Sequence, residues 1–245
     1  MSDATHGIFI KTPSPHVIEV LATAGLDFVV VDAEHAPFDR ADLDRMMLAG
    51  RAAGVPVLVR VVDNSASSIL TPLDLGAAGI IVPHVDSADA ARKVVAAARY
   101  RGGARGFSSA PRHAGYGTRP MRDIIGMADR ALVIVQIEHP DAARDVCEIL
   151  SVEGVDGILV GRADLALAMG EEDTNAPIVH DAVTSLFARV GNSPKLKGVV
   201  VSNEAERARY AQLGANWFIM GNDQSLLRGA VVRLLAEQTL TNVNA

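Results

Sequence analysis

Cysteine, lysine and aromatic residues are scarce in this chain of 245 residues, and long apolar runs are missing. The one cysteine, Cys147, cannot form a disulfide within the chain, which fits a reducing cytoplasm. It lies in VCEIL (146–150), the apolar pattern of a helix face, so we expect a buried and inert thiol. No stretch of about 18 apolar residues and no signal-peptide pattern is present, so we expect a cytoplasmic protein without a membrane span.

Positive charge is also limited, since 23 basic residues face 29 acidic ones and the net charge is −6. Nucleic-acid binding depends on clustered Lys and Arg, and no basic block is present, so we expect no nucleic-acid partner. What the chain does have is apolar content, 49% of its residues, which is enough for a sizeable core and excludes a disordered chain.

Short runs rich in Val and Ile alternate with longer amphipathic segments. Near-continuous apolar runs of this length are typical of parallel strands that are covered on both faces. We expect eight strands, at 7–10, 27–32, 56–62, 79–83, 131–138, 156–161, 197–202 and 216–221. The Ala- and Leu-rich segments between them predict helices, several of which end at a glycine that suits a left-handed cap.

Eight such units in 245 residues match a (β/α)8 TIM barrel, an α/β fold, which we expect as a single domain over residues 1–245. The main alternative is a doubly wound open sheet. That fold often carries a Gly-rich dinucleotide turn after its first strand, whereas here the first strand leads into KTPSP (11–15). The long irregular stretch at 100–120 predicts a functional or mobile loop.

Polar residues follow directly on the apolar runs at the ends of the expected strands, which is where TIM barrels carry their chemistry. Strand 2 ends in DAEH (32–35), strand 3 in Arg60, strand 5 in QIE (136–138) and strand 6 in Gly161, with Asp164 three residues later. A barrel without a function would rarely place an Arg and a Glu inside the strand registers, so Arg60 and Glu138 are candidate site residues.

Gln136 and Glu138 are two residues apart on a strand, so their side chains share one face. A buried lone Glu is costly unless it is paired or bound to a metal, and Asp164 on the next loop is the natural second carboxylate. Two carboxylates suit Mg2+ or Mn2+, which take oxygen ligands and keep several waters. No histidine spacing indicates a zinc site.

Asp32 and His35 lie together after strand 2, and a carboxylate near an imidazole orients it and raises its basicity. A capping or packing role for His35 stays open at this point. His84, which follows Pro83, we interpret as a structural loop residue rather than a site residue.

Only four lysines are present, at positions 11, 93, 195 and 197, and only Lys11 lies near the expected active rim. A Schiff-base enzyme needs a desolvated lysine there, so the sequence favours a metal-stabilised enolate over an imine. The loops after strands 7 and 8 lack the Gly-rich amide cluster of a phosphate site.

A set of motifs in this order resembles the HpcH/HpaI aldolase family over nearly the whole chain. The motifs are VVVDAEHAPFD (29–39), VLVRV (57–61), LDLGAAGIIVPHVDSADAAR (73–92), ARYRGGARGFSSAPRHAGYG (98–117), VQIEHPDA (135–142) and VEGVDGILVGRADLALAMG (152–170). The family comprises class II, metal-dependent pyruvate aldolases of the 4-hydroxy-2-oxoheptanedioate aldolase kind, which act in aromatic or sugar acid catabolism.

The resemblance implies a lyase that reversibly cleaves a 4-hydroxy-2-oxo acid to pyruvate and an aldehyde through a metal-bound enolate, with oxaloacetate decarboxylation as a side activity. Glu138 and Asp164 would hold the divalent cation, which would be Mg2+, Mn2+ or Co2+. Gln136 and Ala163 would touch the substrate, Ala163 through its backbone amide, together with Asp164 and Arg60.

The resemblance also implies the remaining catalytic roles. Arg60 would stabilise the enolate or the aldol oxyanion, and His35 would be the general base, helped by Asp32. Asp74 matches a family carboxylate that raises the basicity of that histidine, across a subunit boundary, because the family forms homohexamers. We therefore expect a homo-oligomer.

Three positions near the expected acceptor pocket depart from the family pattern. Phe9 stands where a Trp is common, Lys11 replaces a small residue, and Arg162 stands where Gly-Pro-Ala-Asp-Leu has its Pro. Arg162 either brings a positive charge to the substrate or points outward. Two rival functions stay open, a CoA-ester lyase of the citrate-lyase β or malyl-CoA type and a catalytically silent barrel.

Overall fold

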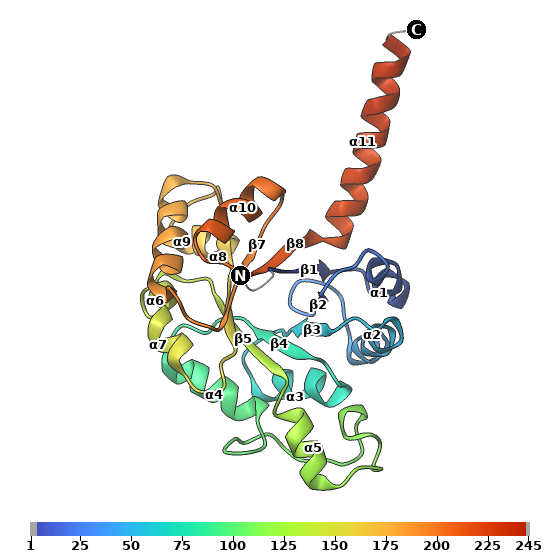
Figure 1. Cartoon of the computed structure of the whole chain (residues 1–245), viewed down its shortest axis with the longest axis vertical. Helices are drawn as coiled ribbons and strands as arrows, with labels where there is room; N and C mark the ends of the chain where they lie inside the picture. Colours follow the sequence, from blue (N-terminus) through green and yellow to red (C-terminus); the bar gives the residue numbers. More distant parts are fainter. Residues whose placement is uncertain (1–3, 244–245) are drawn as a thin grey trace.

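The computed structural model describes residues 4–243 as a closed barrel of eight parallel strands, joined in sequence order with β8 closing on β1 and helices outside (Figure 1). The expected (β/α)8 barrel is confirmed, and all eight expected strands are present. The strands are β1 (Thr5–Ile10), β2 (Phe28–Asp32), β3 (Val57–Arg60), β4 (Gly79–Val82), β5 (Leu132–Ile137), β6 (Gly157–Val160), β7 (Leu196–Val200) and β8 (Trp217–Asn222).

Helices follow the strands, and some connections carry more than one. They are α1 (Pro15–Ala22), α2 (Arg40–Ala53), α3 (Ala66–Leu75), α4 (Ala88–Ala98), α5 (Met121–Ala128), α6 (Pro140–Arg144), α7 (Val146–Ser151), α8 (Arg162–Ala168), α9 (Pro177–Val190), α10 (Glu204–Gln212) and α11 (Asp223–Val243). The long stretch at 100–120 contains one short 3-10 turn, Arg112–Ala114. In the part of the chain from 4 to 243, no helix is long and apolar enough to cross a bilayer.

The strand residues alternate between two separate cores, because successive side chains point to opposite faces of a strand. One core fills the barrel interior with one or two residues from most strands: Phe9, Phe28, Val30, Leu58, Ile81, Ile134, Leu159, Trp217 and Ile219. The other lies between the strands and the helices and takes the alternate positions, such as Val29, Val31 and Val59. The interior is therefore a packed core rather than a pore, as in other barrels of this kind.

Two stacked aromatic rings close the interior near the N-terminal ends of the strands. The rings of Phe28 and Trp217 lie 4.5 Å apart between centroids. A β-carbon at Gly7 would come within 2.3 Å of the Phe28 ring, and one at Gly198 within 2.5 Å of the Trp217 ring. Glycine at these positions makes room for the aromatic rings, which leaves only the C-terminal mouth for a site.

One expectation about the surface is wrong. Cys147 is exposed, on the short helix α7, where we expected a buried thiol. Its helix is only six residues long, and the buried positions are Val146, Ile149 and Leu150. The apolar pattern predicted the buried face correctly, but Cys147 lies beside that face rather than on it.

Helix α11 differs from the other helices in its direction. It begins directly after β8 and projects away from the barrel (Figure 1). Several of its apolar side chains are exposed, including Leu227 at 71% and Leu234 at 60%.

Candidate active site

The interior register of the strands continues into polar side chains at the C-terminal mouth. Asp32 comes two residues after Val30, Arg60 two after Leu58, and Gln136 two after Ile134, and all three face inward and are buried. Because every second side chain of a strand points into the barrel, the strands that supply apolar side chains to the interior also supply charged and polar side chains at its C-terminal end. This is why Asp32, Arg60 and Gln136, together with Glu138, meet at one end of the fold.

Asp32 and Arg60 form a buried ion pair between neighbouring strands. They are register partners on β2 and β3, and Asp32 accepts two hydrogen bonds from Arg60, 2.9 Å from Nε and 2.8 Å from Nη2. Lys11 Nζ lies 3.0 Å from the same carboxylate. Burial of Asp32 opposes its ionisation, but the hydrogen bonds and charges of Arg60 and Lys11 outweigh it and hold the pKa of Asp32 below its ordinary value.

Glu34 lies at the centre of the charged cluster, although the sequence pattern alone did not predict it as a site residue. Its carboxylate lies 3.3 Å from Arg60 Nη1, 3.4 Å from His84 Nε2 and 3.7 Å from His35 Nε2. Burial, opposed by the Arg60 guanidinium, raises the pKa of Glu34 above its ordinary value, and the negative charge of Glu138 acts in the same direction. The signal in the sequence was its spacing, two residues beyond Asp32.

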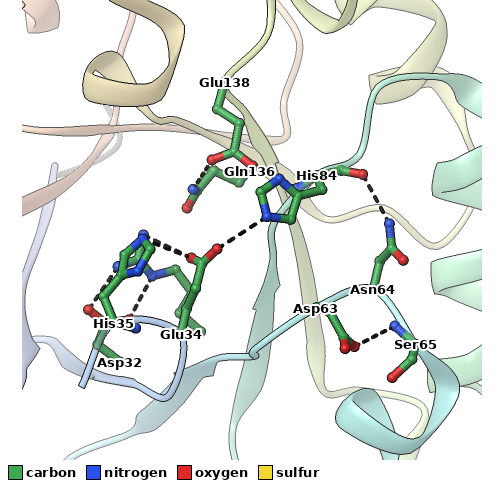
Figure 2. A network of polar contacts seen from close by, with 10 residues as sticks. Asp32, Glu34, His35, Asp63, Asn64, Ser65, His84, Gln136 and Glu138 are labelled. Atoms are coloured by element: carbon green, nitrogen blue, oxygen red, sulfur yellow. Dashed lines mark hydrogen bonds and ion pairs between the residues drawn. The ribbon is translucent and has the colours of Figure 1, made fainter. Parts of the chain in front are cut away.

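Glu138 is 5% exposed, and both of its carboxylate oxygens have donors. Oε1 accepts the backbone N–H of His84 at 2.7 Å, and Oε2 accepts the side-chain amide of Gln136. Figure 2 shows Gln136, Glu138, His84 and Glu34 converging on one space. Gly161, the residue directly after β6, borders that space, because a β-carbon there would lie 3.3 Å from Glu138 Oε2.

His84 belongs to this cluster, although we interpreted it as a structural loop residue. Its ring Nδ1 lies 3.0 Å from Glu138 Oε1. His84 lies just after the C-terminal end of β4, and Asp32, Arg60 and Glu138 lie at the corresponding ends of β2, β3 and β5. That strand-end position was the available signal, and the intervening Pro83 obscured it.

His35 lies beside Glu34 with 53% of its side chain exposed, so its ring is accessible to a ligand. The Asp32 carboxylate accepts the backbone N–H of His35 at 3.2 Å. Asp32 therefore fixes the backbone of His35, while the imidazole itself approaches Glu34.

Ala163 and Asp164 lie in the first turn of α8, for which Gly161 is the N-terminal cap, and both are exposed. The place of Gly161 beside Glu138 brings this turn to the same rim. No group of three or more His, Cys, Asp and Glu residues able to hold a metal is present within residues 4–243. Glu138 and Asp164 are therefore two candidate ligands rather than a complete protein cage.

Asp74 is not part of this cluster in the single chain. It lies on α3 and accepts a hydrogen bond from Arg105 Nη2 at 2.8 Å, and its carboxylate lies 3.7 Å from His113 Nδ1. Burial and the nearby charge of Arg105 lower the pKa of His113. Asp74 thus sits in a second polar cluster, formed with the loop at 100–120.

The three positions that depart from the family pattern have different surroundings. The Phe9 ring packs against the Arg60 guanidinium, with 4.7 Å between Arg60 Cζ and the ring centroid. Lys11 binds Asp32, as described above. Arg162 points away from the mouth toward α10, where Nη2 donates to Glu206 at 3.0 Å and Nη1 to the Tyr210 hydroxyl at 3.2 Å.

The arrangement brings together a buried carboxylate, a fixed guanidinium and an accessible imidazole. Such a set can bind a cation, stabilise an oxyanion and move a proton within one small space.

Comparison with known proteins agrees with this geometry. Residues 5–230 match the family model described as HpcH/HpaI aldolase/citrate lyase. The chain belongs to this family. It is accordingly a carbon–carbon lyase, and the resemblance inferred from the motifs is confirmed.

Relatives within the HpcH/HpaI family carry aldolase names. A 5-keto-4-deoxy-D-glucarate aldolase of Klebsiella pneumoniae is 35% identical over 231 residues, which cover 93% of this chain and 90% of that protein. A 4-hydroxy-2-oxo-heptane-1,7-dioate aldolase of Escherichia coli is 35% identical over 233 residues, covering 94% and 88%.

A solved structure of the family has the same fold. The HpcH/HpaI aldolase/citrate lyase family protein from Burkholderia cenocepacia superimposes with a TM-score of 0.91 at 28% identity, covering 97% of this chain and 95% of the other. The barrel is therefore shared across almost the full length of both chains.

Proposed function

We propose that the protein is a metal-dependent aldolase that reversibly cleaves a 4-hydroxy-2-oxo acid to pyruvate and an aldehyde. The observation that carries the proposal is that the buried Glu138 carboxylate and the fixed Arg60 guanidinium share one barrel mouth, where His84 and Glu34 connect them. The aldolase names of the two relatives support the substrate class. The acceptor aldehyde is a small molecule that enters from the same mouth.

The residues at the mouth fit a divalent cation. Among residues 4–243, Gln136 Oε1 is a buried oxygen that accepts no hydrogen bond, so it is available to an additional partner. Gly161 keeps the space beside Glu138 Oε2 free of a side chain. Glu138 and Asp164 would hold the cation, and oxygen ligands with water positions suit Mg2+, Mn2+ or Co2+.

When bound, the cation would supply positive charge against the pyruvate carboxylate and the developing enolate oxygen. Gln136, and Ala163 through its backbone N–H, would orient the pyruvate half of the substrate. Arg60 would face the oxyanion that forms as the carbon–carbon bond breaks. Asp32 occupies two of its N–H groups and Glu34 faces Nη1, which fixes the guanidinium while the other N–H groups stay open to a ligand.

His35 would take the proton from the aldol hydroxyl, because its ring is exposed at the mouth and held close to Glu34. In the direction of synthesis it would return that proton to the new hydroxyl. Oxaloacetate decarboxylation releases the same pyruvate enolate, so we expect it as a side activity that needs the cation and Arg60 but not the proton transfer at His35.

The experiment that tests the proposal measures pyruvate release from a 4-hydroxy-2-oxo acid with a coupled lactate dehydrogenase assay. EDTA should abolish the activity and Mn2+ or Mg2+ should restore it. Glu138→Gln should lower kcat/KM by at least about 100-fold, because even a group that only supports a metal ligand is worth 10–100-fold. Its melting temperature should stay close to that of the wild type, which would separate loss of function from loss of fold.

Borohydride trapping tests the alternative mechanism, in which pyruvate forms an imine with a lysine. An imine on Lys11 would be reduced in the presence of pyruvate and would inactivate the enzyme irreversibly. We expect no such inactivation, because Lys11 Nζ is paired with Asp32. Full activity after EDTA together with borohydride inactivation would contradict the metal-dependent proposal.

We also propose that the chain functions as a homo-oligomer, and specifically as the hexamer that the family resemblance implies. Helix α11 would form part of the contact between subunits. The exposed apolar side chains of α11 support this assignment, and the occupant of its apolar face would be a second copy of the chain. In such an assembly, the Asp74 carboxylate of one subunit would raise the basicity of His35 in a neighbouring subunit.

A further inference from the structure

The imidazole of His84 lies between two buried carboxylates of the site (Figure 2). Nδ1 is 3.0 Å from Glu138 Oε1, and Nε2 is 3.4 Å from Glu34 Oε1. The backbone N–H of His84 donates to the same Glu138 oxygen at 2.7 Å. One residue therefore approaches this oxygen with both its peptide group and its side chain.

The backbone conformation of His84 makes this double approach possible. Its φ is +56°, in the left-handed region that residues with a β-carbon rarely adopt. The side-chain amide of Asn64, in the loop after β3, donates to the His84 carbonyl oxygen at 3.0 Å. The turn after β4 is thus held from one side by Asn64 and directed at Glu138 on the other.

His84 also connects two halves of the site. Glu34 contacts His84 with Oε1, at 3.4 Å, and lies 3.3 Å from Arg60 Nη1 with Oε2. The contacts therefore run without a break from Glu138, the candidate cation ligand, through His84 and Glu34 to the Arg60 guanidinium. A shift of the ring would change the position of one half relative to the other.

We propose that His84 is a positioning residue that orients the Glu138 carboxylate for the cation and ties it, through Glu34, to Arg60. This inference rests on the proposed function, because it assigns Glu138 a cation. Hydrogen-bonding partners of a ligating carboxylate commonly set metal affinity, and their loss costs 10–100-fold in affinity or activity. A role in stability alone is a poor explanation, since the His84 side chain is 62% exposed and exposed ion pairs contribute little.

The test measures Mn2+ binding from the EPR signal of the free ion, together with steady-state kinetics, on the full chain. In His84→Ala, which keeps the peptide N–H but loses the ring, we expect the Mn2+ dissociation constant to rise about 10–100-fold. In His84→Asn the side-chain amide can approach the same Glu138 oxygen in place of the ring, and Asn tolerates a positive φ, so most of the affinity should return. At saturating Mn2+, kcat should follow the same order, because Arg60 depends on the same contacts.

His139→Asn is the matched control, because it makes the same change at the neighbouring strand end. The His139 ring accepts the backbone N–H of Asp141 and caps α6, a role that Asn also fills. We expect this variant to bind Mn2+ like the wild type. All variants should keep the wild-type melting temperature within a few degrees.

The possible outcomes separate the two proposals. Wild-type Mn2+ affinity in His84→Ala, or an Asn variant as weak as the Ala variant, overturns the positioning role and leaves the proposed aldolase intact. A wild-type chain that binds no divalent cation at all overturns the proposed function, and this inference with it.

Discussion

Gly161 decides how much space lies beside the Glu138 carboxylate. A β-carbon at this position would lie 3.2 Å from Glu138 Cβ and 3.3 Å from both Glu138 Oε2 and Gln136 Nε2. These approaches are closer than ordinary van der Waals contact, so one of the two side chains would have to move. Because the φ of Gly161 is −88°, an alanine meets no backbone strain there, and the effect would come from the side-chain contact alone.

We expect Gly161→Ala to lower kcat/KM about 10-fold or more and to weaken Mn2+ binding. A displacement of a few tenths of an ångström is felt in a preorganised site, since catalytic groups must stay close to their productive geometry. Steady-state kinetics and Mn2+ titration measure both effects. Gly126→Ala on α5 is the control, because a β-carbon there meets nothing within 4 Å. Equal kinetics for both variants would show that the space beside Glu138 has no role.

Residue by residue, the sequence predicted the parts of the site that belong to strands. Asp32, Arg60, Gln136 and Glu138 follow from period-two alternation, which continues an interior register to the mouth. His84 could not be predicted in the same way. Its side chain reaches the site because the turn after β4 has a positive φ at His84. A histidine in a sequence does not by itself indicate a positive φ.

At the level of the elements, the site depends on the alignment of β2 with β3. Their register places Asp32 opposite Arg60, and Asp32 is fully buried. Removing one partner of a buried pair leaves an uncompensated charge and costs about 3–5 kcal/mol. The pair therefore fixes the two strand ends as well as the guanidinium.

The lowered pKa of Asp32 predicts how stability depends on pH. A carboxyl whose pKa is lower in the folded state stabilises the fold above its unfolded pKa, about 3.9, and loses that contribution as the pH falls toward the folded value. Asp32→Asn should lower the free energy of unfolding by up to about 3 kcal/mol at pH 7, and the difference from the wild type should shrink below about pH 4. Urea unfolding at pH 7 and at several acid values measures this difference.

An exposed carboxylate provides the comparison for that measurement. Asp89, on α4, is 82% exposed and contacts Arg92, so Asp89→Asn should change stability by less than about 1 kcal/mol. A difference between Asp32→Asn and the wild type that stays constant from pH 7 down to pH 3 would mean that the ionisation of Asp32 does not stabilise the fold.

The strands were the best-predicted elements, because a buried parallel strand reads as a continuous apolar run whatever surrounds it. The connections were less predictable. The segment between β5 and β6 forms two short helices, α6 and α7, and Cys147 is exposed because it lies beside the buried face of α7 rather than on it. Helices of five or six residues depend on tertiary contacts rather than on their own propensity.

For the whole molecule, the feature that the sequence did not predict is the direction of α11. This 21-residue helix leaves the barrel after β8, and Leu227, Val231 and Leu234 lie on one face of it, at the spacing i, i+4 and i+7. A cavity of about 370 Å³ lies at its base, lined largely by apolar groups of α1 and of the start of α11. An exchange of helices between two copies would cover both surfaces reciprocally, which is a low-cost route to a dimer.

Two charged substitutions on that face, Leu227→Arg with Val231→Arg, should therefore break the proposed homo-oligomer into smaller species. Buried apolar side chains of this size are worth about 1.5–3 kcal/mol each, and a buried unpaired charge adds a further cost. Light scattering coupled to size-exclusion chromatography measures the mass, and Arg228→Ala, on the same helix but off the stripe, is the control that should leave it unchanged. Because Asp74 is separated from His35 within one chain, the dissociated variant should also lose aldolase activity while its Mn2+ affinity persists. A double variant with the wild-type mass would assign the oligomer contact to another surface.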